Sequence, residues 1–281
     1  MTITTPLEPR LLVETDAHEG PVHVADEDTL YFTTSRPDVA IRRLELASGR
    51  LSTVRADANA ANGMALGRDG RLVVCEQGAF HRAAAITAID RATGATETLV
   101  DAWHGLPLNS PNDVVVARDG SLWFTDPSYG HLQGFRPEPV LDDRVYRLDP
   151  ATGELTVAAD GFDKPNGLVF SPAEDVLYVG DNGAPHRLLA FDVADGRLDG
   201  RRIVAELPAE HPDGLAVDAA GRIYASTPAG VRILAPSGET VGEIALPGAV
   251  NFAWREPGRE VLYVTAETAI WAVDVAQVAT A

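Results

Sequence analysis

The sequence lacks most features that mark secreted, membrane-spanning or nucleic-acid-binding proteins. Its single cysteine, Cys75, excludes an internal disulfide framework and fits the reducing cytoplasm. The chain has no run of about 18 apolar residues that would span a bilayer. Its first ten residues lack the basic start and the apolar run of a signal peptide. We therefore expect a cytoplasmic protein.

Basic residues are also scarce, and almost all of them are arginine. Lys164 is the only lysine. The 23 basic residues are outnumbered by 41 acidic ones, which gives a net charge of -18. Because like charges repel, this balance disfavours nucleic acids and anionic membranes as partners. The sequence carries no signal for a particular oligomeric state.

What the sequence does contain is one short phrase repeated six times. Each copy opens with an oxygen-bearing residue, and an apolar run with strand character follows ten or eleven residues later. The openings are Glu19, Asn62, Asn112, Asn166, Asp213 and Asn251. They are spaced by 43, 50, 54, 47 and 38 residues, and a period in this range with strand-like units indicates a β-propeller.

A second repeat of the form strand, turn, strand interleaves with the first. Its turns carry a glycine, which supplies the positive φ of a tight hairpin. The two repeats together give about four strands per unit, as in a propeller blade. We predict an all-β fold, a single six-bladed β-propeller domain over residues 1–281. The sixth unit lacks a fourth strand, and residues 10–14 are predicted to supply it and close the ring.

Equivalent positions in propeller blades face one axis, so the six openings are predicted to converge. The alternative is that they are turn residues, because Asn-Gly and Asp-Gly are common in turns. Glutamate has no such preference, and proline, which stiffens the backbone, precedes three of the openings. We therefore select Glu19, Asn112, Asn166 and Asp213 as candidate metal ligands.

This candidate set offers two carboxylates and two amide oxygens, with no thiolate or imidazole. Hard oxygen donors of this kind suit Ca²⁺ best, with Mg²⁺, Mn²⁺ or Zn²⁺ as alternatives. Two negative charges would neutralise one divalent ion, whereas converging carboxylates without an ion would repel each other. The sequence therefore predicts one divalent cation in the channel.

Five phrases that contain these residues follow one another along the chain. They are Glu19-Gly-Pro21, Asn109-Ser-Pro-Asn-Asp113, Phe124-Thr-Asp-Pro-Ser-Tyr-Gly130, Lys164-Pro-Asn-Gly-Leu168 and Pro212-Asp-Gly-Leu215. In this order they resemble the senescence-marker-protein/gluconolactonase family, also called regucalcin-like, over nearly the whole chain. The resemblance implies a six-bladed propeller with one divalent ion in the central channel and a hydrolase that opens lactones. It places the metal ligands on Glu19, Asn112, Asn166 and Asp213.

The resemblance also assigns Asp213 as the general base or nucleophile. A carboxylate bound to a metal is a poor base, so a hydroxide held by the ion is the alternative. Ser110 stands where some family members carry arginine, and Gln77 stands where histidine is common. These departures lie on the substrate side and leave the identity of the lactone open. Candidate substrate-binding residues are Asn62, Ser110, Tyr129 and Asn251.

Tyr129 lies in the longest insert, residues 126–144, which is either a recognition loop or an ordinary variable loop. Two other functions fit the same sequence. The cation would activate another ester or a phosphotriester equally well, or the propeller binds a ligand without catalysis. The sequence has no serine-hydrolase elbow, phosphate loop or zinc-protease motif. We expect a small-molecule lactone or ester as partner.

Overall fold

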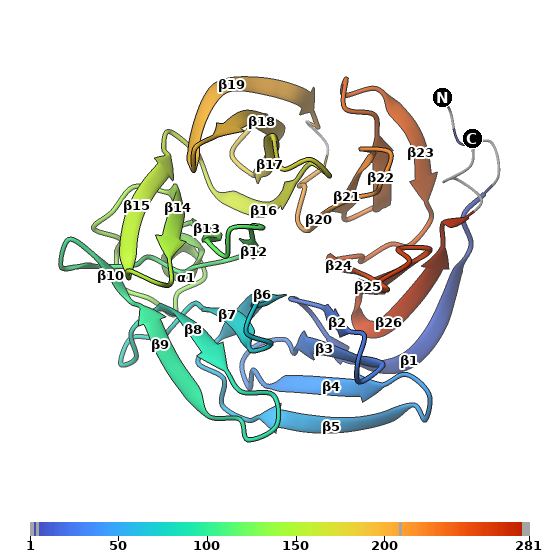
Figure 1. Ribbon diagram of the computed structural model, residues 1–281, viewed down its shortest axis with the longest axis horizontal. Coiled ribbons are helices and arrows are strands. Elements are labelled where there is room, and N and C mark those ends of the chain that lie inside the picture. The colour runs from blue at the N-terminus through green and yellow to red at the C-terminus, as the bar shows by residue number, and fades with distance from the viewer. Residues whose placement is uncertain (1–2, 4–5, 208–209, 277–281) are drawn as a thin grey trace.

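The computed structural model describes residue 3 and residues 6–207 and 210–276. Six four-stranded sheets are arranged around a central axis, which confirms the predicted all-β, six-bladed propeller (Figure 1). One short helix, α1 (Tyr129–Leu132), is found within the described ranges. No helix among these residues is long and apolar enough to cross a bilayer.

Each blade runs from an inner strand at the axis to an outer strand at the rim. The inner strands are β2 (Val22–Val24), β6 (Ala61–Leu66), β12 (Val114–Val116), β16 (Pro165–Phe170), β20 (Leu215–Val217) and β24 (Asn251–Trp254). The second strands are β3 (Thr29–Thr33), β7 (Leu72–Glu76), β13 (Leu122–Asp126), β17 (Val176–Asp181), β21 (Ile223–Thr227) and β25 (Val261–Thr265). These second strands contain the six apolar runs of the repeat.

The remaining strands form the outer half of each blade. The third strands are β4 (Ile41–Glu45), β8 (Ala85–Ile89), β14 (Arg144–Asp149), β18 (Arg187–Ala194), β22 (Gly230–Leu234) and β26 (Glu267–Asp274). The outer strands are β5 (Arg50–Arg55), β9 (Thr96–Val100), β15 (Glu154–Ala159), β19 (Arg197–Glu206), β23 (Thr240–Ile244) and β1 (Pro9–Ala17). A small hairpin, β10 (Ala102–Trp103) and β11 (Leu106–Pro107), follows β9.

The sixth blade takes its outer strand from the other end of the chain. β1 pairs antiparallel with β26, with Pro9 opposite Val273 and Glu14 opposite Ala269. In Figure 1 the blue N-terminal strand lies beside the red strands of the last blade. The pairing joins the first and last segments of the ring and covers the edge of β26.

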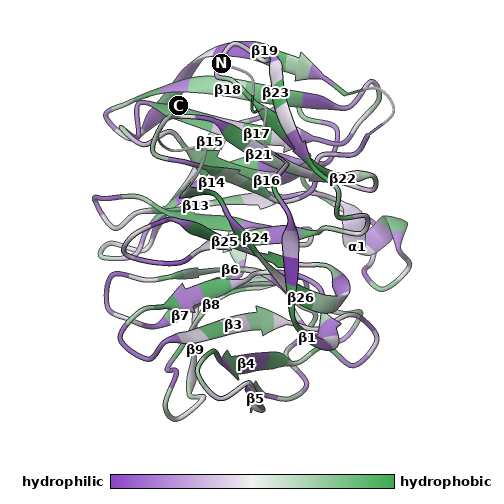
Figure 2. Ribbon diagram, turned by 90° about the vertical axis from the view of Figure 1, so that its right-hand side faces the viewer, coloured by the Kyte–Doolittle hydropathy of each residue, from purple (hydrophilic) through white to green (hydrophobic). Residues whose placement is uncertain are grey.

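The second strands form the core because each lies between two strands of its own blade and between two neighbouring blades. Every residue of β3, β7, β13 and β21 is buried. Aromatic side chains on these strands, among them Tyr31, Phe124 and Tyr224, are fully buried. Figure 2 shows the hydrophobic strands stacked in layers, with hydrophilic residues mostly in the connecting loops. The core therefore follows from the repeated apolar runs.

The Asn-Gly and Asp-Gly pairs of the repeat are not turns. Asn62 and Asn166 lie within inner strands, and the glycines that follow them have no positive φ. A Cβ atom added at Gly63 would lie 2.6 Å from the backbone oxygen of Asn112, and one at Gly167 would lie 2.2 Å from that of Asp213. These glycines allow adjacent blades to approach closely at the axis.

Candidate functional site

The openings of the repeat meet at one end of the central channel, where the inner strands begin. Five of the six, all but Asn251, surround a cavity of about 420 Å³, here called the donor cavity. Its lining includes Glu19, Asn62, Asn112, Asn166, Asp213 and Tyr129. All four predicted metal ligands and two of the four predicted substrate contacts therefore lie around one space. They reach it from five blades, because each opening lies at or near the start of an inner strand.

Hydrogen bonds fix the first carboxylate of the set. Glu19 is buried, and its Oε2 accepts a bond from the backbone N–H of Gly20 at 3.0 Å. The same oxygen accepts a bond from Nδ2 of Asn251 at 2.7 Å. Asn251 does not line the donor cavity, so the structure places this predicted substrate contact behind Glu19, where it orients a candidate ligand.

The two candidate amide ligands each present an oxygen without a partner. Asn112 and Asn166 are buried, and in the part of the chain that the structure describes their Oδ1 atoms accept no hydrogen bond. Their backbones are held in place, since Nδ2 of Asn62 donates to the carbonyl of Asn112 at 3.1 Å and Oγ1 of Thr125 donates to that of Asn166 at 2.8 Å. Buried acceptors of this kind are costly unless something binds them.

The pKa values of the two carboxylates also favour a bound cation. Burial, followed by the nearby charge of Asp213, raises the pKa of Glu19 to about 8. Burial also raises the pKa of Asp213 to about 6, against the opposing influence of His18. The Asp213 carboxyl is close enough to share side-chain hydrogen bonds with both Asn166 and Glu19. The two carboxylates therefore disfavour each other's charge, and a bound cation would relieve that repulsion.

The donor set fits a hard divalent cation. Among the described residues, no three His, Cys, Asp or Glu side chains form a metal-binding cluster. A cation at the donor cavity would therefore depend on the amide oxygens of Asn112 and Asn166 as well as on the carboxylates of Glu19 and Asp213. Two carboxylates with two unpartnered amide oxygens match the preference of Ca²⁺ or Mg²⁺ for oxygen ligands.

The wall of the donor cavity includes residues that the repeat did not reveal. Tyr129 stands on α1, and its hydroxyl accepts a bond from Nδ2 of Asn182 at 3.0 Å. Asn182, Gln77 and Thr34 line the cavity, and each directly follows the second strand of its blade. This shared position, one residue after the second strand, was a signal in the sequence that could have identified Asn182 and Thr34, whereas Gln77 was already placed on the substrate side by the family resemblance. Other lining residues missed by the sequence interpretation are Arg36, Gln133 and His211.

Ser110 lies apart from the donor cavity. It is fully buried, and its hydroxyl donates to the carbonyl of Pro127 at 2.6 Å while accepting from the N–H of Gly130 at 2.9 Å. Its own backbone N–H donates to Oδ1 of Asp126 at 2.8 Å. Ser110 therefore holds the start of the 126–144 insert against the third blade, and its side chain has no free donor directed at a ligand.

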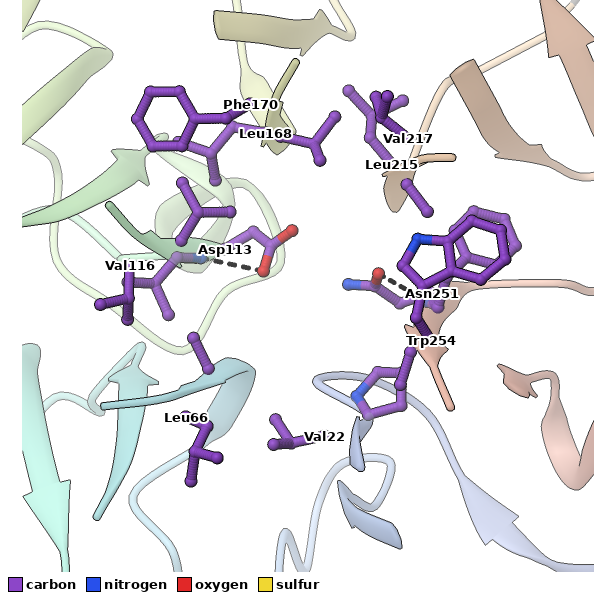
Figure 3. Close-up of a pocket in the computed structure, with 18 of the residues that line it drawn as sticks. Val22, Leu66, Asp113, Val116, Leu168, Phe170, Leu215, Val217, Asn251 and Trp254 are labelled. Atoms are coloured by element: carbon purple, nitrogen blue, oxygen red, sulfur yellow. Dashed lines mark hydrogen bonds between the residues drawn. The ribbon is translucent and has the colours of Figure 1, made fainter. Parts of the chain in front are cut away.

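The opposite end of the channel is different in character. A cavity of about 660 Å³, here called the apolar cavity, opens where the inner strands end. Its labelled lining in Figure 3 is Val22, Leu66, Asp113, Val116, Leu168, Phe170, Leu215, Val217, Asn251 and Trp254. Asp113 and Asn251 approach from opposite sides of the ring and bond to local backbone, through Val114 N at 2.9 Å and Phe252 N at 2.7 Å. The rest of this labelled wall is hydrophobic.

Sequence comparison connects this geometry to known proteins. The profile of the SMP-30/Gluconolactonase/LRE-like region matches residues 17–268. A gluconolactonase of Zymomonas mobilis is 30% identical over 270 residues, which cover 87% of this chain and 74% of that protein. A lactonohydrolase of Aspergillus oryzae is 29% identical over 84% of this chain, and the match spans 64% of the fungal protein.

Solved structures of a gluconolactonase and a regucalcin superpose on this chain over most of its length. The gluconolactonase XC5397 of Xanthomonas campestris superposes with a TM-score of 0.87 at 32% identity, covering 97% of this chain and 96% of that one. A regucalcin of Agrobacterium tumefaciens, described as a calcium-binding protein, superposes with a TM-score of 0.78 at 19% identity. It covers 95% of this chain and 94% of that one, and at this identity the likeness concerns the fold.

Proposed function

The chain belongs to the SMP-30/gluconolactonase/LRE-like family, and from this premise we propose that it is a lactone hydrolase that depends on one divalent cation. The observation that carries the proposal is the convergence of two carboxylates and two unpartnered amide oxygens on the donor cavity. Glu19, Asn112, Asn166 and Asp213 would hold the cation. Relatives named gluconolactonase and lactonohydrolase support a lactone as the substrate.

When bound, a divalent cation would supply a Lewis acid that polarises the lactone carbonyl and balances the two carboxylate charges. Glu19 is the anchoring ligand, because its orientation is already fixed by Gly20 and Asn251. Asn112 and Asn166 complete the set with neutral oxygens, so the pair of carboxylates alone sets the charge of the site. Ca²⁺ is the proposed ion, since amide and carboxylate oxygens are its preferred ligands.

Asp213 is the proposed general base, because it lines the donor cavity beside the other candidate ligands. It takes a proton from the attacking water while the water oxygen forms a bond to the carbonyl carbon. The bond between that carbon and the ring oxygen then breaks, and the ring oxygen receives the proton held by Asp213. The product is an open-chain hydroxy acid, and Asp213 is returned to its starting state.

Substrate contacts belong to the walls of the donor cavity. Asn62 and Tyr129 line it directly and are the proposed contacts to the hydroxyls of the ring. Asn251 and Ser110 are proposed to act indirectly. Asn251 orients Glu19, and Ser110 holds the start of the 126–144 insert in place. We also retain a cytoplasmic location as part of the proposal, supported by the single, buried and free thiol of Cys75.

The test is hydrolysis of a panel of γ- and δ-lactones, a simple ester and a phosphotriester, before and after treatment with EDTA. The proposal expects lactone opening that EDTA abolishes and that Ca²⁺, Mg²⁺ or Mn²⁺ restores. Faster cleavage of the phosphotriester than of any lactone would reassign the same site to phosphoryl chemistry. Ligand binding without turnover, unchanged by EDTA, would show a non-catalytic propeller and overturn the proposal.

A further inference from the structure

The 126–144 insert forms part of the wall of the donor cavity, which Tyr129 and Gln133 line. It leaves the third blade after β13, includes α1, and lies on one face of the disc (Figure 2). Arg136 is buried and anchors it through backbone carbonyls: Nε donates to Asn109 at 3.0 Å, and Nη1 donates to Ala79 at 3.2 Å and Arg82 at 3.1 Å. The last two residues belong to the loop of the second blade, so the insert crosses that blade.

Beyond the second blade the insert reaches a loop of the first. The guanidinium carbon of Arg36 lies 3.5 Å from the centroid of the Phe135 ring, and Phe135 is itself buried. Stacking of this kind fixes the plane of a guanidinium while leaving its N–H donors unused. Arg36 also lines the donor cavity. The insert therefore holds a rigid, planar cation at the cavity wall.

The guanidinium of Arg36 has no polar partner among the described residues. Among the described residues it makes no hydrogen bond and no ion pair, although Asp38 is two residues away and the chain has 41 acidic residues. Most other arginines in the molecule pair with a carboxylate or donate to backbone carbonyls, as Arg82 does with Asp57. An unused guanidinium fork at a cavity wall is suited to a carboxylate or phosphate group of a ligand.

A second cation lies on the same wall. Lys164, the only lysine of the chain, lines the donor cavity and forms an ion pair with Asp163. The other titratable groups facing the cavity are Glu19 and Asp213, whose charges a divalent ion would balance, the neutral phenol of Tyr129, and the histidines His18 and His211. With those two carboxylates balanced and Lys164 paired with Asp163, the guanidinium of Arg36 is a positive charge on the cavity wall without a counter-ion among the described residues. In a protein of net charge -18, this is a local reversal of sign.

We propose that Arg36, stacked on Phe135 and assisted by Lys164, binds an anionic substituent of the substrate, so that the enzyme prefers sugar lactones carrying a carboxylate or a phosphate over neutral ones. This inference rests on the proposed lactone hydrolysis and names the substrate class for the same cavity. Arg36 is a specificity residue in this account: it binds the substituent and takes no part in breaking the ester bond.

The test compares three lactones that share a six-membered ring: glucono-δ-lactone, its 6-phosphate, and the δ-lactone of glucaric acid, in which C6 is a carboxylate. For Arg36→Met we expect kcat/KM to fall roughly ten- to hundredfold for a charged lactone, mainly through KM, because one charge-assisted contact is lost. For the neutral lactone the change should stay within about threefold. The charged lactone whose kcat/KM falls more in Arg36→Met shows whether phosphate or carboxylate is the group that Arg36 recognises.

Two control variants separate charge recognition from structural effects. Arg36→Lys should recover part of the preference, because it keeps the charge but not the planar fork. Arg68→Met removes another exposed arginine that lies outside the donor cavity and should leave all three lactones unaffected. Equal losses of Arg36→Met on charged and neutral lactones would overturn the inference, as would wild-type protein that favours the neutral lactone.

Calorimetry with the calcium-loaded protein gives a readout that does not need turnover. The open-chain acids 6-phosphogluconate and glucarate should bind more tightly than gluconate, and Arg36→Met should remove that difference. If the wild-type protein opens no lactone, the proposed function fails, while binding of these acids that depends on Arg36 would still support an anion-binding cavity. Lactone hydrolysis with no dependence of binding on Arg36 would keep the function and overturn this inference.

Discussion

The two ends of the central channel are built by the same six inner strands, yet they are chemically opposite. At the donor cavity, where the strands begin, the lining is rich in carboxylates and amides, and the amide oxygens of Asn112, Asn166 and Asn182 have no partner among the described residues. At the apolar cavity, where the strands end, the wall is mainly valine, leucine and aromatic residues (Figure 3). The apolar cavity is the larger of the two, at about 660 Å³ against about 420 Å³.

The comparison shows that the two cavities differ in chemical character, and that the larger one is the less polar. Both cavities result from the ring geometry, in which six strands cannot fill the axis. The donor cavity differs in having buried amide oxygens that lack partners within the described ranges beside two carboxylates, and buried acceptors of this kind are costly unless something binds them. At the apolar cavity Asp113 and Asn251 are bonded to backbone, and the buried group there that has no partner among the described residues and is not on a histidine is a donor, Nε1 of Trp254, which cannot bind a cation. The chemistry is therefore assigned to the strand starts, and the following changes test that assignment.

The largest effect is expected from Asp213→Asn at the donor cavity. The amide keeps the size of the side chain but cannot accept the proton of water, so kcat/KM for a lactone should fall roughly 10²- to 10⁴-fold. The matched change at the apolar cavity, Val116→Ala, should leave kcat/KM within about threefold, since surface-lining substitutions there touch no reacting group. Full turnover by Asp213→Asn with cation bound would remove Asp213 as the base.

The next effect concerns the rigidity that keeps the strand starts together. Gly167→Ala places a Cβ 2.2 Å from the backbone oxygen of Asp213 in the next blade, so blades four and five must move apart. We expect the free energy of unfolding to fall by about 1–3 kcal/mol, as for other overpacked sites. Urea denaturation measures this directly.

The matched control for that change is Gly258→Ala. The three atoms nearest to a Cβ at Gly258 all belong to the carboxylate end of the Glu260 side chain, which can move away. Unchanged stability of Gly167→Ala, equal to that of the control, would mean that the glycines of the repeat do not serve close approach of the blades.

A smaller effect is expected from Asn251, which lies between the two cavities. Asn251→Ala removes the 2.7 Å hydrogen bond to Oε2 of Glu19. Loss of a group that orients a ligand typically lowers metal affinity about 10- to 100-fold, and calorimetric titration with Ca²⁺ measures it. Trp254→Phe, on the same strand but at the apolar cavity, should not change the affinity. If Asn251→Ala and Trp254→Phe bound Ca²⁺ with equal affinity, Asn251 would have no role in orienting the cation ligand Glu19.

The smallest effect is a pH dependence that only the donor cavity should show. In the cation-free chain the pKa of Glu19 is raised to about 8, so folding favours its protonated form and stability falls as pH rises through that value. A cation competes with this proton, so its affinity should rise between about pH 6 and 8, by at most about tenfold per unit for one proton released. The melting temperature with and without saturating Ca²⁺ measures both trends.

The matched variant for the pH trend is Glu19→Gln, which has no proton to lose at this position. Its cation-free melting temperature should not show the fall between pH 6 and 8 that the wild-type chain shows. A calcium-induced rise in melting temperature that is the same at pH 6 and pH 8 would contradict the assignment of Glu19 as a ligand.

The blade architecture could be predicted from the sequence because it is repeated six times. Apolar runs such as Leu122-Trp-Phe fall in the second strands, and the turn glycines all have positive φ, from Gly49 at 70° to Gly238 at 88°. The positions of the donors followed from the same repeat, since equivalent residues must face one axis. Repetition thus supplied the long-range information that a single strand pattern lacks.

Contacts outside the repeat could not be predicted in the same way. Asn251 fits the repeat as well as Asn166 does, but only three-dimensional geometry shows that it bonds to Glu19 and does not line the donor cavity. The stacking of Arg36 on Phe135 joins residues 99 positions apart across an intervening blade, and no local pattern encodes it. The contacts of the 126–144 insert are therefore the part of the structure that the sequence predicts least well. The insert is also where we expect substrate preference to be determined.

The most direct test of the account is calcium binding to the wild-type chain and to the double variant Asn112→Ala, Asn166→Ala, measured by isothermal titration calorimetry at pH 8. One ion per wild-type chain, with binding lost in the folded double variant, is the predicted result. Retained binding of one ion by that variant, or no binding by the wild-type chain at millimolar calcium, would contradict the claim that the strand starts converge on a cation.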